Sequence, residues 1–282
     1  MNAGVALRDA FRLLSGSELT QPRLEAELLL AEASGRSREQ LIAWPERELE
    51  ADTIARFHDL LKRRLGGEPI AYIRGHQAFW TLDLKVTSDT LIPRPETELL
   101  VEVALELLPA HEHLTIADAG TGSGAIAAAL ACERPRWYLI AIERNPAAAK
   151  IASDNLRRYA SVNASLLRGS WLTPFALGSL NAVVSNPPYV PEDDPHLALG
   201  DLRFEPRSAL AAGTDGLAAI RRISAEAAEC LRPGGLLALE HGFDQGPAVR
   251  AVLQAEGLER IETRLDLAGI ERVTFGCLPR WL

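Results

Sequence analysis

A glycine-rich loop followed by an acidic residue is the first feature that could do chemistry. The loop, Asp118–Gly124, reads Asp-Ala-Gly-Thr-Gly-Ser-Gly and lies between a strand-like run and a helix-like run that begins at Ala125. Alternate glycines let the backbone approach a ligand closely, and the helix N-terminus attracts negative groups. Glu143 ends the next predicted strand. Its carboxylate can accept both ribose hydroxyls of an adenosine-containing ligand, so NAD and S-adenosylmethionine both fit this pattern.

A second feature is the tetrapeptide Asn186-Pro187-Pro188-Tyr189, which directly follows the predicted strand Ala182–Ser185. The two prolines fix φ and carry no N–H, so the backbone offers acceptors and no competing donors. Asn186 adds a side-chain carbonyl, and this rigid pair of acceptors suits a planar NH₂ group. Tyr189 can pack against a flat π-system beside it. A proline turn that only ends a strand is the simpler interpretation, but the glycine loop favours a functional one.

The strand order expected of this fold predicts where the two features meet. In an open parallel sheet, ligands bind beyond the carboxyl ends of the strands, where the strand order reverses. The strand before the glycine loop is the first of the sheet, and the strand before the tetrapeptide is the fourth. These two strands are neighbours across that point, so we expect the two loops to share one crevice.

The alternation of strands and helices from about residue 96 predicts a doubly wound, mostly parallel α/β sheet. The predicted strands are Leu114–Asp118, Tyr138–Glu143, Ser165–Arg168, Ala182–Ser185 and Leu236–Glu240, followed by a terminal pair at Ile261–Leu265 and Arg272–Cys277. The predicted helices are Glu96–Leu108, Ala125–Cys132, Ala147–Tyr159 and Gly216–Leu231.

Residues 1–75 have a different pattern, which predicts only helices packed as a small bundle. The apolar stripes are Leu24, Leu28 and Ala31 before a stop at Gly35, and Ile54, Phe57, Leu61 and Leu65 before Gly66-Gly67. Ser37–Gln40 fits a capping box. The basic run Lys62-Arg63-Arg64 is interpreted as a solvated helix face.

A connection of about twenty residues separates these two patterns. Trp80, Leu82, Leu84 and Val86 alternate with polar residues, which predicts a β-hairpin. Pro93 and Pro95 then break regular structure. The predicted organisation is therefore a helical domain over residues 1–75, a hairpin linker over 76–95 and the α/β domain over 96–282.

Composition excludes several classes of protein. The chain has 282 residues, of which 47% are hydrophobic, and a net charge of −8. This acidity argues against binding that depends on neutralising many phosphates. No apolar run is long enough to span a bilayer, and the first twenty residues lack the apolar core of a signal peptide. The three cysteines lie far apart, and His111-Glu112-His113 follows a proline in a polar stretch. We therefore expect a cytoplasmic protein without a metal site.

Longer motifs connect the chain to a known family. They are Gly67–Tyr72, Leu91–Glu98, Val184–Tyr189, Asp194–His196, Arg203–Pro206 and Glu240–Gly242. With these motifs the chain resembles the bacterial peptide chain release factor N5-glutamine methyltransferase family. The resemblance implies a helical N-terminal domain, a hairpin linker and a seven-stranded Rossmann-like methyltransferase domain. It also implies methyl transfer from S-adenosylmethionine to the glutamine of the Gly-Gly-Gln loop of class I release factors. We further expect a monomer whose helical domain docks the substrate.

The resemblance also assigns roles to residues. Gly120, Thr121, Gly122, Ser123, Gly124, Glu143, Trp171 and Asn186 would contact the cofactor. Asn186, Pro187, Pro188 and Tyr189 would hold the glutamine amide, with Asn186, Pro187 and Tyr189 as the catalytic group. Three positions depart from the family pattern: Glu143 stands where Asp is usual, Ser123 where Thr is usual, and Ser170 where an acid often precedes Trp171. Arg94 is expected either to line the cofactor entrance or to form a structural ion pair.

Three other functions remain as alternatives. A nucleic-acid amino-methyltransferase acting on adenine N6 or guanine N2 would use the same tetrapeptide chemistry, but the acidic charge argues against it. A nicotinamide oxidoreductase would explain the glycine loop and Glu143 and would leave Asn186–Tyr189 without a role. A non-catalytic protein that binds the cofactor and ribosomal factors would bind without methyl transfer.

Overall fold

The computed structural model describes residues 1–16 and 21–280, which divide into two compact units. One unit contains Met1–Gly75 together with the short segment Gly200–Phe204. The other contains His76–Leu199 and the chain from Glu205 onward. Each unit has its own hydrophobic core.

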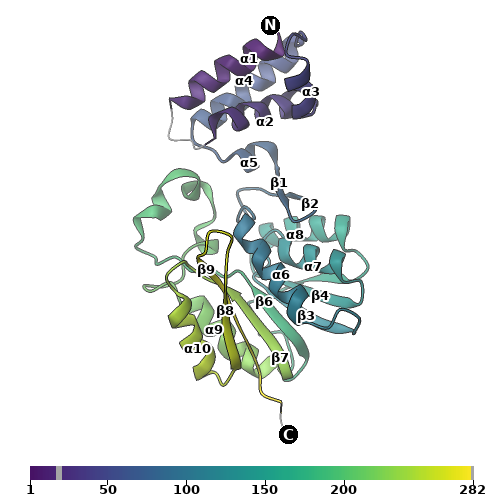
Figure 1. The fold of residues 1–282 in the computed structure, drawn as a ribbon, viewed down its shortest axis with the longest axis vertical. Coiled ribbons are helices and arrows are strands. Elements are labelled where there is room, and N and C mark those ends of the chain that lie inside the picture. The colour runs from purple at the N-terminus through teal and green to yellow at the C-terminus, as the bar shows by residue number, and fades with distance from the viewer. Residues whose placement is uncertain (17–20, 281–282) are drawn as a thin grey trace. The chain divides into compact units, whose positions relative to one another are not determined.

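The first unit is a bundle of helices (Figure 1). They are α1 (Ala3–Ser15), α2 (Pro22–Ser34), α3 (Arg38–Ala43), α4 (Ala51–Leu65) and α5 (Ile70–Arg74), with the 3₁₀ turn η3 (Gly200–Phe204). Two predicted ends are confirmed. Ser37 and Gln40 form the capping box of α3, and Gly35 ends α2 in the left-handed conformation at φ 65°.

The buried face of α2 differs from the predicted stripe. Ala26, Leu29, Leu30 and Ala33 are buried, whereas Leu24, Leu28 and Ala31 are half-buried. The reason is that α2 packs against both α1 and α4, so more than one of its faces is covered. A helix in the middle of a bundle has no single apolar stripe that identifies its core face. Leu65, at the end of the predicted α4 stripe, is 44% exposed.

Arg64 is buried, which contradicts its assignment to a solvated helix face. Its side chain is 3% exposed and donates to Glu25 at 2.6 Å and to Asp201 at 2.9 Å. It also donates to the backbone carbonyls of Gly67 and Glu68. The neighbouring Lys62 and Arg63 are exposed, as predicted. Asp201 belongs to Gly200–Phe204, so Arg64 attaches this distant segment to the helices of the same unit.

The second unit begins with the predicted hairpin, formed by β1 (His76–Phe79) and β2 (Leu82–Lys85) paired antiparallel. Leu82, Leu84 and Val86 are buried, as their alternation predicts. Trp80 is not part of a strand. It lies in the turn with φ 56°, and its backbone N–H donates to the carboxylate of Glu98 at 2.7 Å.

The main sheet of this unit has seven strands in the order β5-β4-β3-β6-β7-β9-β8. They are β3 (Leu114–Ala119), β4 (Trp137–Glu143), β5 (Ala164–Arg168), β6 (Leu180–Ser185), β7 (Leu231–Glu240), β8 (Glu259–Leu265) and β9 (Glu271–Cys277). The helices are α6 (Glu98–Leu107), α7 (Ala125–Glu133), α8 (Pro146–Tyr159), α9 (Ala218–Cys230) and α10 (Gly246–Ala255), with 3₁₀ turns at η1 (Pro95–Thr97), η2 (Pro195–Ala198) and η4 (Arg207–Ala209). Every predicted strand is present, and β7–β9 and β8–β9 are the antiparallel pairs.

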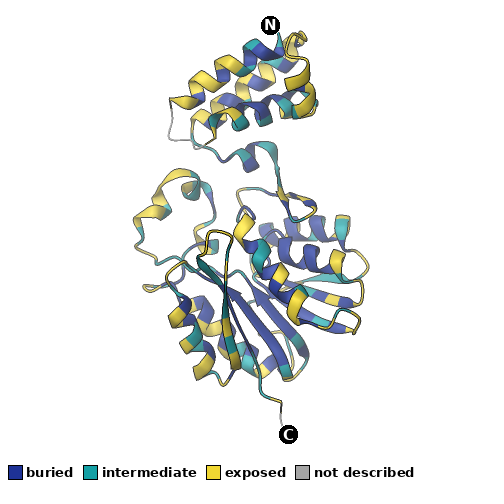
Figure 2. Cartoon of the chain, in the orientation of Figure 1, coloured by how far each residue is buried: buried dark blue, intermediate teal, exposed yellow. Residues whose placement is uncertain are grey.

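Helices cover both faces of this sheet, so its central strands are buried on both sides (Figures 1 and 2). Alternate residues face two separate cores. Ile116 and Val184 pack in the core with α6, α7 and α8, whereas Ala117 and Val183 pack in the core with α9 and α10. This double burial explains why the strands read as continuous apolar runs. Among the described residues, no helix is both long and apolar enough to cross a bilayer.

The central pair of strands positions the functional loops. β3 and β6 are parallel neighbours, with Asp118 opposite Val184. The loops after both strands therefore leave the sheet at the same carboxyl edge. This arrangement is the one predicted for the glycine loop and the tetrapeptide.

We expect Arg64→Met to destabilise the helical unit by about 3 kcal/mol, because it removes the buried guanidinium and leaves the half-buried Glu25 carboxylate without its partner. Arg63→Met is the matched control, because Arg63 pairs with Glu68 at the surface with 44% of its side chain exposed. That change should cost less than about 1 kcal/mol. Amide hydrogen exchange of peptides from α2 and α4 measures both. Equal protection in the two variants would contradict the role of Arg64.

Candidate active site

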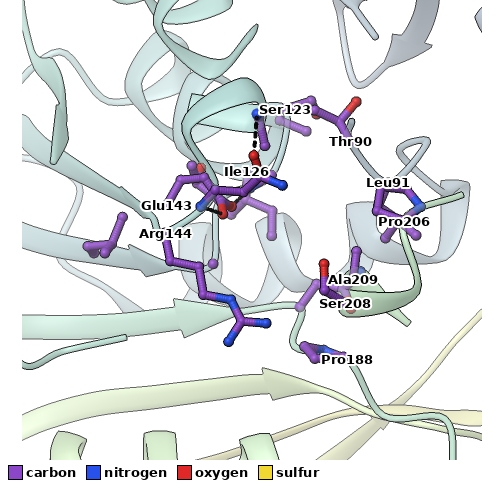
Figure 3. A pocket seen from close by; sticks show the side chains of 18 of the residues that line it. Thr90, Leu91, Ser123, Ile126, Glu143, Arg144, Pro188, Pro206, Ser208 and Ala209 are labelled. Atoms are coloured by element: carbon purple, nitrogen blue, oxygen red, sulfur yellow. Dashed lines mark hydrogen bonds between the residues drawn. The ribbon is translucent and has the colours of Figure 1, made fainter. Parts of the chain in front are cut away.

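A single cavity at the carboxyl edge of the sheet contains both predicted loops (Figure 3). Its walls include Gly120–Ser123 after β3, Glu143 at the end of β4, Trp171, and Asn186 with Pro188 after β6. Leu91 and Pro93 before α6, and Pro206, Ser208 and Ala209 from the η4 region, complete the lining. The predicted shared crevice is therefore present.

The conformation of the loop requires its glycines. Gly120, Gly122 and Gly124 have φ values of 76°, 56° and 84°. A Cβ atom at Gly120 would lie 2.8 Å from Cζ3 of Trp171, so a larger residue there would displace the indole. Gly124 lies at the N-terminus of α7, where a Cβ would contact Ala152 of α8 at 3.4 Å. The glycines therefore serve both the turn and the close approach of neighbouring groups.

Asp118 holds the glycine loop against the helix that follows it. One carboxylate oxygen, Oδ2, accepts from the Thr121 hydroxyl and from the N–H of Ala127 at 3.2 Å. The side chain is fully buried, and burial raises its pKa to about 6. Oδ1 has no hydrogen-bond partner among the described residues.

Glu143 is oriented by backbone groups on both of its oxygens. Oε2 accepts from the N–H of Gly122 at 3.1 Å, and Oε1 accepts from the N–H of Asn145 at 2.8 Å. The carboxylate is thereby fixed at the cavity wall beside the glycine loop (Figure 3). Each oxygen retains a further lone pair, so the group can still accept the two hydroxyls of a ribose.

Trp171 belongs to a tight turn between β5 and β6. It has a φ of 49°, and its ring lines the cavity next to Gly120. The turn is held by the Ser170 carbonyl, which accepts from Thr173, and by Glu226, which accepts from the N–H of Leu172 at 2.7 Å. Ser170 therefore contributes to this turn through its backbone carbonyl.

The residues of the tetrapeptide point in different directions. Asn186 and Pro188 line the cavity, and Pro187 is buried between them. The Asn186 Nδ2 donates to the Thr97 hydroxyl at 3.0 Å. Tyr189 packs against the core under α9 and α10 and donates its hydroxyl to Glu240 at 3.3 Å. Burial and the nearby carboxylate raise the pKa of Tyr189, so its hydroxyl stays protonated.

Two further carboxylates support these loops from behind. Glu240, at the end of β7, is 1% exposed, and burial raises its pKa to about 7. Glu205 accepts from the N–H of Ile92 at 3.0 Å and pairs with Arg94. Arg94 therefore forms a structural ion pair. It connects the segment before α6 to the segment that begins η4, and both segments line the cavity.

His241 follows Glu240 and is fully buried. Its Nε2 lies 2.8 Å from the Thr274 hydroxyl and its Nδ1 lies 2.9 Å from the Gly242 carbonyl. Burial lowers its pKa. His241 is therefore a neutral, hydrogen-bonded residue of the core.

Sequence reasoning gave no role to four residues that shape this site: Thr97, Asp118, Glu205 and Glu240. All four lie within the sequence motifs named above. Their side chains, however, form hydrogen bonds with other residues of the protein, and spacing along the chain does not predict such contacts.

Comparisons with known proteins place the chain among methyltransferases. Residues 5–75 match the PrmC N-terminal domain model, and residues 96–203 match the Methyltransferase small domain model. The chain is 48% identical over 272 residues to the release factor glutamine methyltransferase of Vibrio cholerae, covering 96% of this chain and 95% of that protein. It is 50% identical over 267 residues to the release factor glutamine methyltransferase of Pseudomonas aeruginosa, covering 94% and 96%.

The chain belongs to the release factor glutamine methyltransferase family. A methyltransferase from Pyrococcus furiosus, 17% identical, has the same fold with a TM-score of 0.54 over 78% of this chain and 98% of that protein. The family membership explains the motifs that extend beyond the glycine loop.

The cavity fits S-adenosylmethionine, the methyl donor of this family. Glu143 presents a fixed carboxylate where a ribose can bind, and Trp171 and Ile142 supply apolar surface beside it. Glycine at position 120 leaves the Trp171 ring in place, because a Cβ atom there would lie 2.8 Å from Cζ3 of that ring. The fixed carboxylate and the apolar surface beside it therefore match an adenosine.

We expect Gly120→Ala to weaken S-adenosylmethionine binding by roughly tenfold or more. The strain of a left-handed backbone and the overlap with Trp171 should together cost more than about 1.4 kcal/mol, which corresponds to a tenfold change in affinity. Gly178→Ala is the control, since Gly178 has a similar φ of 59° with nothing within 4 Å of the added carbon. Titration calorimetry measures both affinities. Unchanged binding by Gly120→Ala would contradict the assigned role of the loop.

Proposed function

We propose that the chain transfers a methyl group from S-adenosylmethionine to the side-chain amide nitrogen of the glutamine in the Gly-Gly-Gln loop of class I release factors. Family membership supports this activity. The observation that carries the assignment to this site is the Asn186 amide. Its NH₂ end is held by Thr97, which leaves its carbonyl oxygen free on the wall of the cavity shared with the glycine loop.

The difficulty of the reaction lies in the acceptor. An amide nitrogen is a poor nucleophile because its lone pair is delocalised into the carbonyl. S-adenosylmethionine, when bound, supplies an activated methyl group on a sulfonium sulfur. The chain must therefore hold the amide nitrogen in the attacking geometry.

Asn186 and Pro187 would provide that hold. The Asn186 Oδ1 and the Pro187 backbone carbonyl would accept hydrogen bonds from the two amide hydrogens. As the nitrogen gains positive charge, these hydrogens become stronger donors, so both bonds strengthen in the transition state. After the methyl group has moved from sulfur to nitrogen, one of the two hydrogens leaves to water as a proton. Pro188 completes the wall beside Asn186, and the buried Tyr189 anchors the end of the tetrapeptide.

For the cofactor, we propose that Glu143 accepts the ribose hydroxyls and that Trp171 lies against the adenosine. Gly120–Gly124 would accommodate the charged tail near the N-terminus of α7, with Thr121 and Ser123 inside the loop. Asp118 acts indirectly, because its carboxylate bonds Thr121 and Ala127 and so fixes the loop.

We also propose that the chain acts as a cytoplasmic monomer on a protein and not on nucleic acid. The net charge of −8 supports a protein substrate. The helical unit is proposed to dock the release factor. The segment Gly200–Phe204, which follows the tetrapeptide in sequence, packs with this unit through Asp201 and Arg64, which supports a role in substrate placement.

Mass analysis of a release factor after reaction tests the function. Incubation with S-adenosylmethionine should add 14 Da, the mass of about one CH₂, to the peptide that contains the Gly-Gly-Gln glutamine. A release factor with this glutamine replaced by alanine is the control. Labelled methyl groups in DNA or RNA, and none in release factor, would support the nucleic-acid alternative instead.

We expect Asn186→Ala to lower turnover about 10²- to 10³-fold, because one preorganised acceptor for the substrate amide is lost. Binding of S-adenosylmethionine should stay within a few-fold of the parent protein. Single-turnover methylation of release factor and titration calorimetry measure the two effects. Unaltered single-turnover methylation would show that Asn186 does not hold the amide.

A further inference from the structure

We propose that Glu205 is a positioning residue for the glutamine acceptor, because it closes a circuit of three segments around the Asn186 amide. This inference rests on the proposed function, and it names the wall of the cavity against which the substrate side chain lies. The three segments are residues 91–97, 186–190 and 205–212. Each of them contributes residues to the lining of the cavity.

The first link of the circuit joins the segment before α6 to the tetrapeptide. The Asn186 Nδ2 donates to the Thr97 hydroxyl at 3.0 Å. Thr97 is 3% exposed and is the last residue of η1, directly before α6. The start of the helix therefore holds the hydroxyl to which the Asn186 side chain is bonded.

The second link joins the tetrapeptide to the chain that leaves η4. The backbone N–H of Val190 donates to the Leu210 carbonyl at 2.9 Å, and the N–H of Ala212 donates to the Val190 carbonyl at 2.9 Å. Val190 directly follows Tyr189. Two backbone bonds therefore attach the end of the tetrapeptide to the end of η4.

Glu205 makes the third link, from the start of η4 back to the segment before α6. Its Oε2 accepts from the backbone N–H of Ile92 at 3.0 Å, and its Oε1 accepts from the Arg94 guanidinium. The Glu205 side chain is fully buried, whereas that of Arg94 is 32% exposed. Burying a carboxylate costs its hydration. An apolar contact would join the two segments without that cost, but it would not fix their spacing by two directed bonds.

The wall that Glu205 completes is mostly apolar. Leu91, Pro206 and Ala209 lie on the side of the cavity away from Glu143 (Figure 3). Pro206 and Pro188 carry no backbone N–H, so neither offers a donor that would compete for the acceptors of the tetrapeptide. Such a surface can pack against the two methylenes of a glutamine side chain while its amide reaches those acceptors. The circuit therefore forms the acceptor side of the site.

Glu205→Gln keeps the size of the side chain and removes its charge. The amide has one accepting oxygen where the carboxylate has two, and its NH₂ end cannot accept from Arg94. We expect kcat on release factor to fall about 10- to 100-fold through misplacement of the acceptor wall. The KM for release factor and the dissociation constant for S-adenosylmethionine should change less than about threefold, the latter because Glu143 lies on the other side of the cavity. If Glu205 were only structural, the melting temperature would fall and kcat of the folded protein would match the parent's.

Arg94→Lys tests the same link with the buried carboxylate retained, so it also serves if Glu205→Gln does not fold. Lysine keeps the positive charge but does not place its donors as the planar guanidinium does. We therefore expect a smaller fall in kcat, of about 3- to 10-fold, with unchanged binding of S-adenosylmethionine. A kcat equal to the parent's in the folded Glu205→Gln variant, or in Arg94→Lys where the first variant does not fold, would overturn the proposal.

Glu271→Gln is the matched control. It removes the carboxylate from another ion pair of the same unit, between Glu271 in β9 and Arg250 in α10, which lie 2.9 Å apart. These two residues are outside the lining of the cavity. We expect kcat and KM to stay within about twofold of the parent's, because a partly exposed pair contributes little to geometry elsewhere.

Amide hydrogen exchange tests the circuit without release factor. Peptides that contain residues 91–97 and 205–212 should exchange about tenfold faster in Glu205→Gln, because a hydrogen bond to a charged group is lost, and should match the parent in Glu271→Gln. A parent protein that does not methylate release factor would refute the proposed function and leave this measurement valid. Unchanged exchange in Glu205→Gln, or a loss of S-adenosylmethionine affinity as large as the loss of kcat, would overturn the role of Glu205.

Discussion

The parallel pairing of β3 with β6 is the constraint on which the rest of the site depends. Asp118 lies opposite Val184, so the chain leaves both strands at one edge of the sheet. Everything at this edge follows from that register. The glycine loop leads directly into α7. The tetrapeptide ends β6, and its two prolines restrict the backbone there. Because side chains on a strand alternate between two buried faces, a slip of one residue would turn every side chain of that strand toward the wrong core. The two cores hold the register in place.

Buried carboxylates provide the second level of organisation. Glu205 and Glu240 join segments that are distant in sequence, through a backbone N–H, an arginine or a hydroxyl, whereas Asp118 ties the glycine loop to the start of α7. Burial of such groups opposes folding, as the raised pKa values of about 6 for Asp118 and about 7 for Glu240 show. A carboxylate is useful here because it accepts from several donors at once and fixes the direction in which each donor points. The cavity is therefore lined by loops whose geometry depends on charges placed behind them.

The sequence predicts the features that depend on local pattern. The alternation of apolar runs predicts every strand of the sheet, and the glycines predict the turn before α7, because left-handed φ values demand them. Prediction fails where burial comes from several neighbours, as for the α2 face, and where one charge finds a distant partner. Arg64 is adjacent to Arg63 in the sequence, yet it forms ion pairs with Glu25 and Asp201. These partners lie far away in the chain, so the local sequence pattern does not predict them. Glu240 lies in the motif Glu240–Gly242, but its partner Tyr189 is 51 residues away in the chain, so only the fold brings the two together.

The choice of asparagine at position 186 follows from this arrangement. An ionised aspartate could accept from a substrate amide, but it could not donate to Thr97 as the Asn186 amide does. A hydrophobic residue would offer no acceptor. Asparagine carries a donor and an acceptor on one rigid plane, so holding its donor end inward aims its acceptor end outward. The hydrogen bond from Asn186 Nδ2 to the Thr97 hydroxyl is therefore the contact that orients this side chain at the cavity wall.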